Sequence, residues 1–323
     1  MPTRRAFLGG AAALSVGARA AASPVHTGTV LLQNVMAHGR FVAYQPTAQK
    51  AIDGKLTQAS DDSIRSDLAI LRPWFDGLIT YGAQNGNERV PDVAASLGFH
   101  AVVMGVWDPG DKNEVANAIA AWRRNPKIVA GLSLGNEIVF GKRGTWDDMS
   151  EYLQSVRADA PGLPLTISEP FAEYLDHPES HAVLKATDFM LVNIHPVFES
   201  WFKTGTADNW TDFVVRVMAR LKKIYTRPIL IKETGVPTGP ASAGFNEDMQ
   251  RAFYDLLAKR IHPSRHGAFA YFTAFDEPWR AGDFNPTPGA HPEEAFWGMF
   301  TDARAPKPVM ADLPKLPSRE KGI

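Results

Sequence analysis

Cysteine is absent from this chain of 323 residues. Its absence excludes a disulfide framework, a thiolate zinc site, a thiol nucleophile and a lipid attached through an N-terminal cysteine. An excess of charge of one sign is also lacking, because 34 Lys and Arg residues balance 35 Asp and Glu residues. No basic stripe is present, so nucleic acid is not expected as a partner. A near-neutral chain suits a neutral polymer, whose binding needs no electrostatic steering.

The patterns that bind metals and dinucleotides are missing as well. The nine histidines form no His-x-His pair, and no carboxylate cluster has the spacing of a metal site. No glycine-rich turn of the dinucleotide-binding type follows the first predicted strand. We therefore expect neither a metal nor a cofactor.

The N-terminus lacks a hydrophobic run long enough to span a membrane. Residues 3–8 read TRRAFL, a twin-arginine pattern, and residues 8–16 are mildly apolar. Small-residue cleavage sites follow at 18–20 and 20–22, which predicts a signal peptide over residues 1–22. The pattern predicts export by the bacterial twin-arginine machinery to the periplasm or beyond, without a membrane anchor after cleavage. A basic start followed by an ordinary N-terminal helix is the alternative.

Short, β-rich apolar runs alternate with longer helical patterns over residues 23–323, which predicts βα units around a parallel sheet. The predicted strands are 40–44, 78–81, 101–107, 128–134, 165–168, 189–194, 228–232 and 268–275. Helical spacing is found over 60–74, 114–122, 146–158, 210–225 and 246–260. Eight strands with intervening helices predict a single (β/α)8 barrel of the TIM class, rather than an open doubly wound sheet.

Two of the predicted strands end at a glutamate. Strand 128–134 is followed by Gly135-Asn136-Glu137, and strand 228–232 is followed directly by Glu233. Such a barrel carries its active site at the carboxyl ends of its strands, so both side chains are expected at one mouth. Glycosidic cleavage needs a protonated carboxyl that delivers a proton to the leaving oxygen, and an ionised carboxylate that faces the anomeric carbon. A salt bridge or a helix cap is the alternative for either glutamate taken alone.

The segments around these glutamates resemble glycoside hydrolase family 17, the β-1,3-glucanases and β-1,3-glucanosyltransferases. The similar segments follow in the family's order along residues 38–310. They are LITYG at 78–82, MGVW at 104–107, GNE at 135–137, NIHP at 193–196, ETGVP at 233–237, AFDEPW at 274–279 and WGMF at 297–300. The resemblance implies a β-glucan substrate, with β-1,3 linkages favoured and β-1,2 and β-1,6 linkages left open.

Carried over residue by residue, the resemblance implies that Glu137 is the acid/base and Glu233 the nucleophile of a retaining enzyme. Asn136 is expected to hold the sugar 2-hydroxyl, a contact that strengthens in the oxocarbenium-like transition state. Tyr81 is expected to orient the nucleophile. A retaining pair predicts carboxyl groups about 5–5.5 Å apart. Water or a second sugar can accept the glycosyl group, so hydrolase and transglycosylase both stay open.

Two positions depart from the family pattern. Glu277 and Arg280 match a Glu and Lys pair of the family and are expected to contact the substrate. The arginine keeps its proton and presents a planar fork, which changes what this position can do. Val236 stands where the family has Trp, and the missing ring is expected to reshape one sugar subsite.

Aromatic and polar side chains near the predicted strand ends are further candidates, because the C–H faces of sugars stack on aromatic rings. These candidates are Tyr44, Trp107, Asn193, His195, Phe198, Trp201 and Trp279. Core packing is the alternative for any one ring, and a structural hydrogen bond is the alternative for His195.

Two other functions stay open. Lys232 ends the seventh predicted strand and can form a Schiff base in an aldolase. Because neighbouring residues of a strand face opposite sides, Lys232 is expected to point to the helices if Glu233 faces the barrel mouth. The other alternative is a periplasmic barrel that binds glucan without cleaving it.

Overall fold

The computed structural model describes residues 27–52, 55–282 and 289–317, so the predicted signal peptide lies outside the described residues. Within these residues, nine parallel strands form one sheet in the order β7-β6-β5-β4-β1-β11-β10-β9-β8. The strands are β1 Phe41–Ala43, β4 Gly77–Ile79, β5 Ala101–Val106, β6 Val129–Leu134, β7 Leu165–Thr166, β8 Ser168–Pro170, β9 Met190–Asn193, β10 Ile229–Glu233 and β11 Gly267–Tyr271. A separate antiparallel hairpin joins β2 Ala51–Ile52 to β3 Lys55–Leu56.

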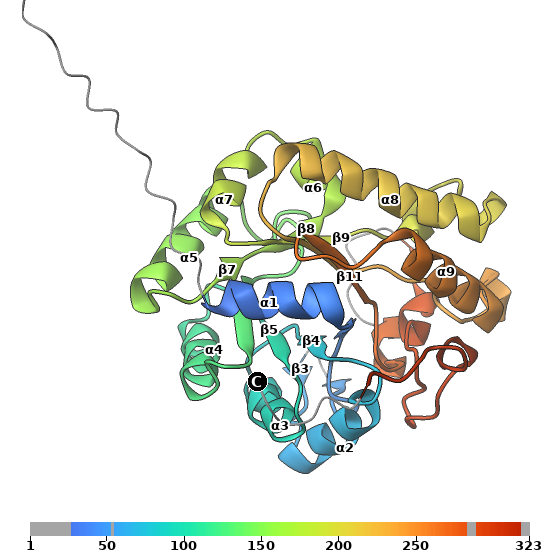
Figure 1. The fold of residues 1–323 in the computed structure, drawn as a ribbon, viewed down its shortest axis with the longest axis horizontal. Helices are drawn as coiled ribbons and strands as arrows, with labels where there is room; N and C mark the ends of the chain where they lie inside the picture. The colour runs from blue at the N-terminus through green and yellow to red at the C-terminus, as the bar shows by residue number, and fades with distance from the viewer. Residues whose placement is uncertain (1–26, 53–54, 283–288, 318–323) are drawn as a thin grey trace, which may run out of the picture.

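One segment closes the barrel. The strand predicted at 165–168 is divided at Ile167 into β7, which pairs with β6, and β8, which pairs with β9. Beyond the division, the Ser168 carbonyl accepts the backbone N–H of Glu137 at 2.8 Å, in the turn that follows β6. Because β1 pairs with both β4 and β11, the sheet is continuous from β7 to β8, and its two ends come together in this one segment (Figure 1). The predicted eight-strand barrel is confirmed, and the ninth strand is the second half of a predicted one.

In the described residues eight helices surround the barrel; those near 60–74, 114–122, 146–158, 210–225 and 246–260 were predicted, and the other three were not. They are α2 Asp61–Leu71, α3 Val90–Ser96, α4 Lys112–Arg124, α5 Trp146–Asp159, α6 Phe171–Leu175, α7 Ser180–Ala186, α8 Ala207–Ile224 and α9 Glu247–Arg260. Side-chain caps start several of them; for example, Ser60 accepts the N–H of Ser63 and Asn246 accepts the N–H of Met249. Among the described helices, none has the length and apolar character needed to cross a membrane.

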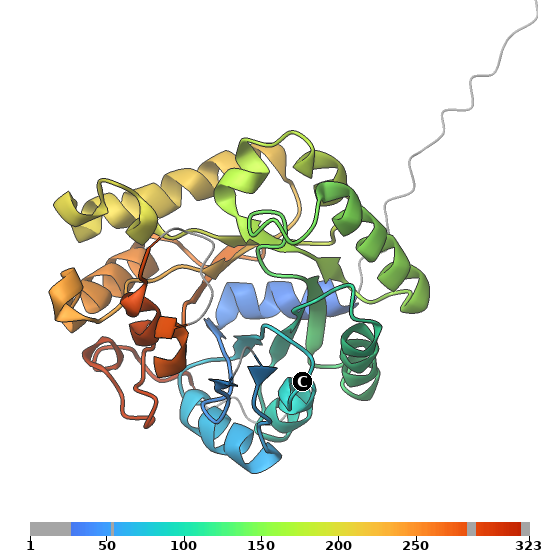
Figure 2. The ribbon, with the colours of Figure 1, turned by 180° about the vertical axis from the view of Figure 1, so that it is seen from behind.

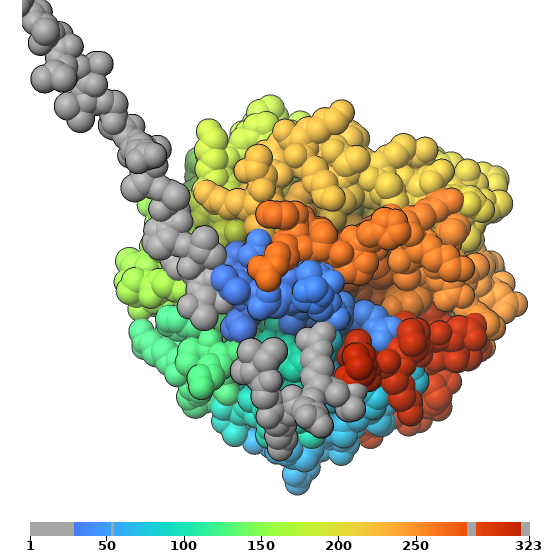
Figure 3. All heavy atoms as spheres, in the orientation of Figure 1, coloured from blue at the N-terminus to red at the C-terminus, as the bar shows by residue number. Residues whose placement is uncertain are grey.

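An additional helix, α1 Thr27–His38, covers the N-terminal end of the barrel. Its side chains Leu32, Val35 and Met36 are buried against residues near the strand starts, such as Ala101 and Leu230. Figures 1 and 3 look onto this end, where α1 lies across the ring of strands and at the molecular surface. This helix was not predicted. It leaves the carboxyl ends of the strands, seen from the opposite side in Figure 2, as the accessible end.

Candidate active site

Glu137 lies just beyond β6 in a turn with left-handed backbone. Gly135 has φ +80° and Glu137 has φ +55°. A Cβ atom at Gly135 would lie 2.3 Å from the Ile138 side chain, so only glycine fits there. A non-glycine residue with positive φ is uncommon, and such strain concentrates at functional sites. The orientation of Glu137 therefore depends on a left-handed backbone conformation, which contacts with the surrounding structure must stabilise.

A buried carboxylate holds the chain that follows Glu137. Glu169 of β8 accepts the backbone N–H groups of Val139 and Phe140 at 2.9 Å and 3.2 Å. Burial raises the pKa of Glu169 to about 8. The sequence reading missed this residue, because a glutamate in a short polar segment gives no signal of the loop that it binds.

Asn193, at the end of β9, contacts the Glu137 carboxyl. Its Nδ2 donates to Glu137 Oε1 at 2.8 Å and approaches Asn136 Oδ1 at 3.3 Å. Burial, and then the negative charge of Glu233, raise the pKa of Glu137 above its usual value. A carboxyl that keeps its proton in this way is suited to donate it to a leaving oxygen.

Glu233 is the last residue of β10 and is buried. Its Oε2 lies 3.3 Å from His195 Nε2, and its Oε1 lies 3.3 Å from Lys232 Nζ. Burial by itself raises the pKa of Glu233, but the Lys232 ammonium and the His195 hydrogen bond outweigh it and lower that pKa to about 2. The pKa values of the two carboxyls are therefore shifted in opposite directions, which favours the proton on Glu137 and the charge on Glu233.

Lys232 corrects an expectation drawn from strand alternation. It was expected to point to the helices, but its side chain is 1% exposed and its Nζ lies 2.6 Å from Asn136 Oδ1. The reason is an irregularity in β10: Ile231 pairs with Val192, and the next pair along the ladder is Glu233 with Asn193. The extra residue locally disrupts the alternation, so both Lys232 and Glu233 reach the barrel mouth.

Asn136 and Tyr81 complete the surroundings of Lys232. Asn136 Oδ1 accepts from both Lys232 Nζ and Asn193 Nδ2. Lys232 Nζ also lies 4.3 Å from the centre of the Tyr81 ring. Burial and the Glu233 charge raise the pKa of Tyr81 well above its usual value, so its hydroxyl keeps its proton.

Aromatic side chains line the same end of the barrel. The His195 ring lies 5.6 Å from the Phe198 ring and 5.1 Å from the Trp297 ring, both edge to face. Phe198, in the turn after β9, is 46% exposed, and Trp107, just beyond β5, is 50% exposed. The Arg143 guanidinium stacks at 4.7 Å from the Trp107 ring. Trp107 and Phe198 therefore have the exposure that a sugar platform needs.

The segment after β11 brings Arg280 to the nucleophile side. Arg280 contacts Glu277 at 3.3 Å and Glu294 at 3.0 Å, and its charge helps to lower the pKa of Glu233. Burial raises the pKa of Glu277 to about 7. Trp279 and Arg280 both belong to a short 3-10 helix, Pro278–Gly282, in which Trp279 is half-buried.

The structure does not bring Tyr44 to the mouth. Its side chain is fully buried, and its hydroxyl donates to Asp67 of α2 at 2.9 Å. The buried Asp67 carboxylate needs hydrogen-bond donors, and Tyr44 supplies one where the chain leaves β1 towards α2. Tyr44 therefore joins the barrel to its helix layer, which corrects its prediction as a substrate contact.

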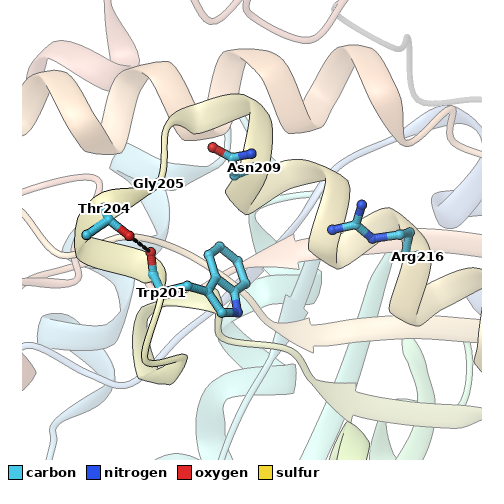
Figure 4. A pocket seen from close by; sticks show the side chains of 5 residues that line it. All are labelled: Trp201, Thr204, Gly205, Asn209 and Arg216. Atoms are coloured by element: carbon cyan, nitrogen blue, oxygen red, sulfur yellow. Dashed lines mark hydrogen bonds between the residues drawn. The ribbon is translucent and has the colours of Figure 1, made fainter.

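Trp201 is also turned away from the catalytic pair. Its ring lies 5.4 Å from the Phe213 ring of α8. Figure 4 shows it lining a separate hollow of about 400 Å³, together with Thr204, Gly205, Asn209 and Arg216. This hollow is lined by no carboxylate, so it offers no acid or nucleophile. Among the described residues, no three or more His, Asp or Glu side chains gather in a way that would hold a metal.

A closed barrel with two carboxyls at the carboxyl ends of its strands, whose pKa values are shifted in opposite directions, has the arrangement of a glycoside hydrolase. The comparison with known families agrees with this class. The chain belongs to the family of the BtgE/BtgC glycoside hydrolase domain, whose model matches residues 42–298. The prediction of a glycoside hydrolase is thereby confirmed.

Individual relatives are distant but cover most of the chain. A glucan 1,3-beta-glucosidase of Arthroderma benhamiae is 24% identical over 273 residues, or 80% of this chain and 86% of that protein. The family 17 β-1,3-glucanosyltransferase of Rhizomucor miehei superposes with a TM-score of 0.62 at 20% identity, over 83% of this chain and 95% of that one. A β-galacturonidase of Eisenbergiella tayi superposes with a TM-score of 0.64 at 14% identity, over 84% of this chain and 50% of that one. At these identities the solved structures show the shared fold, which does not select the sugar.

Proposed function

We propose that the chain is a retaining enzyme of β-glucans, with Glu233 as nucleophile and Glu137 as acid/base. The observation that carries this proposal is the opposite pKa shift of the two carboxyls, one bonded to Asn193 and the other to Lys232 and His195. Glu233 attacks C1 of the sugar, and the C1–O bond breaks towards the leaving oxygen, which takes the proton of Glu137. An acceptor O–H then attacks C1, returns a proton to Glu137 and releases Glu233.

The proposed substrate is a β-1,3-linked glucan. The names of the Arthroderma and Rhizomucor proteins support this choice, since both are named for β-1,3-glucan chemistry. The exposed rings of Trp107 and Phe198 fit the C–H faces of a neutral sugar chain. Asn136 is proposed to hold the 2-hydroxyl of the reacting sugar.

The test is incubation of the purified chain with linear β-1,3-gluco-oligosaccharides, read by mass spectrometry, with Glu233→Gln as the control. Products from wild type alone support the proposal, and shorter or longer chains separate hydrolysis from transglycosylation. The first product should keep the β configuration by NMR. If no product forms, β-1,2 and β-1,6 oligosaccharides are tested next.

Two alternatives have distinct outcomes in the same samples. A glucan-binding protein without turnover would bind oligosaccharide in both wild type and Glu233→Gln and would make no product from any linkage. A Schiff-base aldolase would be trapped on Lys232 by borohydride. The buried contact of Lys232 with Asn136 and Glu233 and the family of the chain both count against the aldolase.

We further propose that residues 1–22 direct export of the folded chain by the twin-arginine route of a bacterium. The proposal is supported by Arg4 and Arg5, the apolar run after them and the small-residue cleavage sites. Replacing both arginines by lysine should retain the protein in the cytoplasm of a bacterial host, as judged by cell fractionation. Unchanged export of that variant would contradict the route.

A further inference from the structure

Lys232 holds a buried ammonium that the proposed reaction does not yet use. Its Nζ lies 2.6 Å from Asn136 Oδ1, 3.3 Å from Glu233 Oε1 and 4.3 Å from the centre of the Tyr81 ring. A buried ion pair is often no more stabilising than apolar residues of the same shape. Stability therefore does not account for this lysine, whereas its position does, because all three partners belong to the candidate site.

The attraction between Lys232 and Glu233 differs between the two halves of the reaction. In the free enzyme the Glu233 carboxylate is charged, and the ammonium stabilises it. Once Glu233 is bonded to C1 its charge is gone, and Lys232 has lost its ionic partner. Release of the sugar restores both the carboxylate and the ion pair.

We propose that Lys232 accelerates the breakdown of the glycosyl-enzyme by stabilising the Glu233 carboxylate as it leaves. This inference rests on the proposed retaining function. The acceptor O–H attacks C1 and its proton passes to Glu137. The bond between C1 and the Glu233 oxygen breaks, and its electron pair stays on that oxygen. The negative charge develops beside an ammonium that is already in place and needs no reorganisation.

The same pairing does not favour the first step. There the ammonium stabilises the carboxylate before it attacks, which is stabilisation of the ground state rather than the transition state. Loss of Lys232 should therefore slow release of the sugar from Glu233 more than formation of the bond. Accumulated glycosyl-enzyme is the direct sign of such a change.

The experiment compares wild type, Lys232→Met and Lys232→Arg on a 2,4-dinitrophenyl β-glycoside of a β-1,3-linked glucose disaccharide. This leaving group makes the first step fast, so kcat reports the second step and kcat/KM reports the first. We expect Lys232→Met to lower kcat by roughly 10–100-fold and to lower KM with it, as expected for loss of one preorganised stabilising group. The glycosyl adduct in the intact mass should persist longer than in wild type, and the burst of dinitrophenol should be followed by a slower steady state. Lys232→Arg keeps the charge and should restore part of kcat.

Lys307 provides the matched control, because it is another buried lysine paired with a carboxylate, 2.6 Å from Asp276. Lys307→Met should lose stability but keep the kcat and the adduct level of wild type. An equal fall of kcat and kcat/KM in Lys232→Met, without an adduct, would overturn the inference. If Lys232→Met does not fold by circular dichroism, Lys232→Gln is measured in the same way. If wild type releases no dinitrophenol, the retaining function itself fails, which is distinguishable from the failure of Lys232 alone.

Discussion

At the residue scale, the site depends on two carboxyls of the same chemical type in different surroundings. Burial, and then the negative charge of Glu233, raise the pKa of Glu137 and so favour its protonated form, although the hydrogen bond from Asn193 acts in the opposite direction. Glu233 lies between an ammonium and an imidazole, so it stays ionised despite its burial. Burial raises the pKa of both glutamates, and only the charged partners of Glu233 reverse that effect, a difference that supports the proposed roles of acid and nucleophile.

These opposite shifts predict the pH dependence of the reaction. For a substrate with a poor leaving group, kcat/KM should fall as pH rises through the raised pKa of Glu137, because the acid loses its proton. It should fall on the acid side only as pH approaches about 2, where Glu233 takes up a proton. The dinitrophenyl substrate needs no acid in the first step, so its kcat/KM should lack the basic limb. Initial rates across pH on both substrates check this, and a basic limb of equal position on both would contradict it.

The Tyr44 side chain gives a second prediction, one of stability rather than activity. Tyr44→Phe removes a buried hydrogen bond to Asp67, which keeps its contacts with Thr47 and Arg304. We expect the free energy of unfolding in urea to fall by about 1–3 kcal/mol, the range for a bond to a charged group. The KM for oligosaccharide should stay unchanged. A higher KM with an unchanged free energy of unfolding would contradict this prediction and indicate that Tyr44 contacts the substrate.

At the element scale, three segments place the site where regular strands and helices alone would not. The extra residue in β10 brings Lys232 beside Glu233. The carboxylate of Glu169 in β8 holds the turn that follows Glu137. Helix α1 closes the opposite end of the barrel with its apolar face. The first two act on the chemistry, whereas α1 acts on the stability of the barrel.

Helix α1 can be tested by its buried side chains. Leu32 is fully buried, so Leu32→Ala leaves a cavity under the barrel and should lower the free energy of unfolding by about 2–5 kcal/mol. The kcat/KM of the folded variant should not change, because α1 lies at the end away from the carboxyls. Val30, on the same helix, is 36% exposed, and Val30→Ala is the control with an expected effect within about 0.5 kcal/mol. Equal effects of the two substitutions would show that α1 does not pack as described.

At the scale of the whole molecule, neither the net charge nor the fold selects the substrate, so we expect the residues at the mouth of the barrel to select it. Acidic and basic residues nearly balance, so no long-range field is available to draw a charged polymer. The same fold is shared with enzymes of different sugar specificity, such as the Eisenbergiella β-galacturonidase. Specificity is therefore expected to come from contacts such as those of Trp107 and Phe198.

This balance predicts a reaction that is insensitive to salt. Between about 0.05 and 0.5 M NaCl, kcat/KM for a neutral oligosaccharide should change by less than about twofold, because screening has no net attraction to weaken. Initial rates at several salt concentrations measure this. A steep fall with salt would contradict this prediction and show that charged groups of the protein affect the reaction of a neutral substrate.

The sequence by itself determined the elements and the chemical pair. Apolar runs predicted eight of the nine strands of the barrel, and two strand ends carried Glu137 and Glu233. These signals are local, because each depends on residues that are neighbours in the chain. They were sufficient for the fold class and for the family.

Only the tertiary structure decided where several side chains point. Lys232 enters the mouth because β10 is irregular against β9, and Tyr44 leaves it because Asp67 lies on a helix beside it. The division of the strand at Ile167, which closes the ring, depends on its two different neighbours. Pairing between strands and contacts between layers join residues that are far apart in the chain. A local sequence pattern therefore cannot predict where these side chains point.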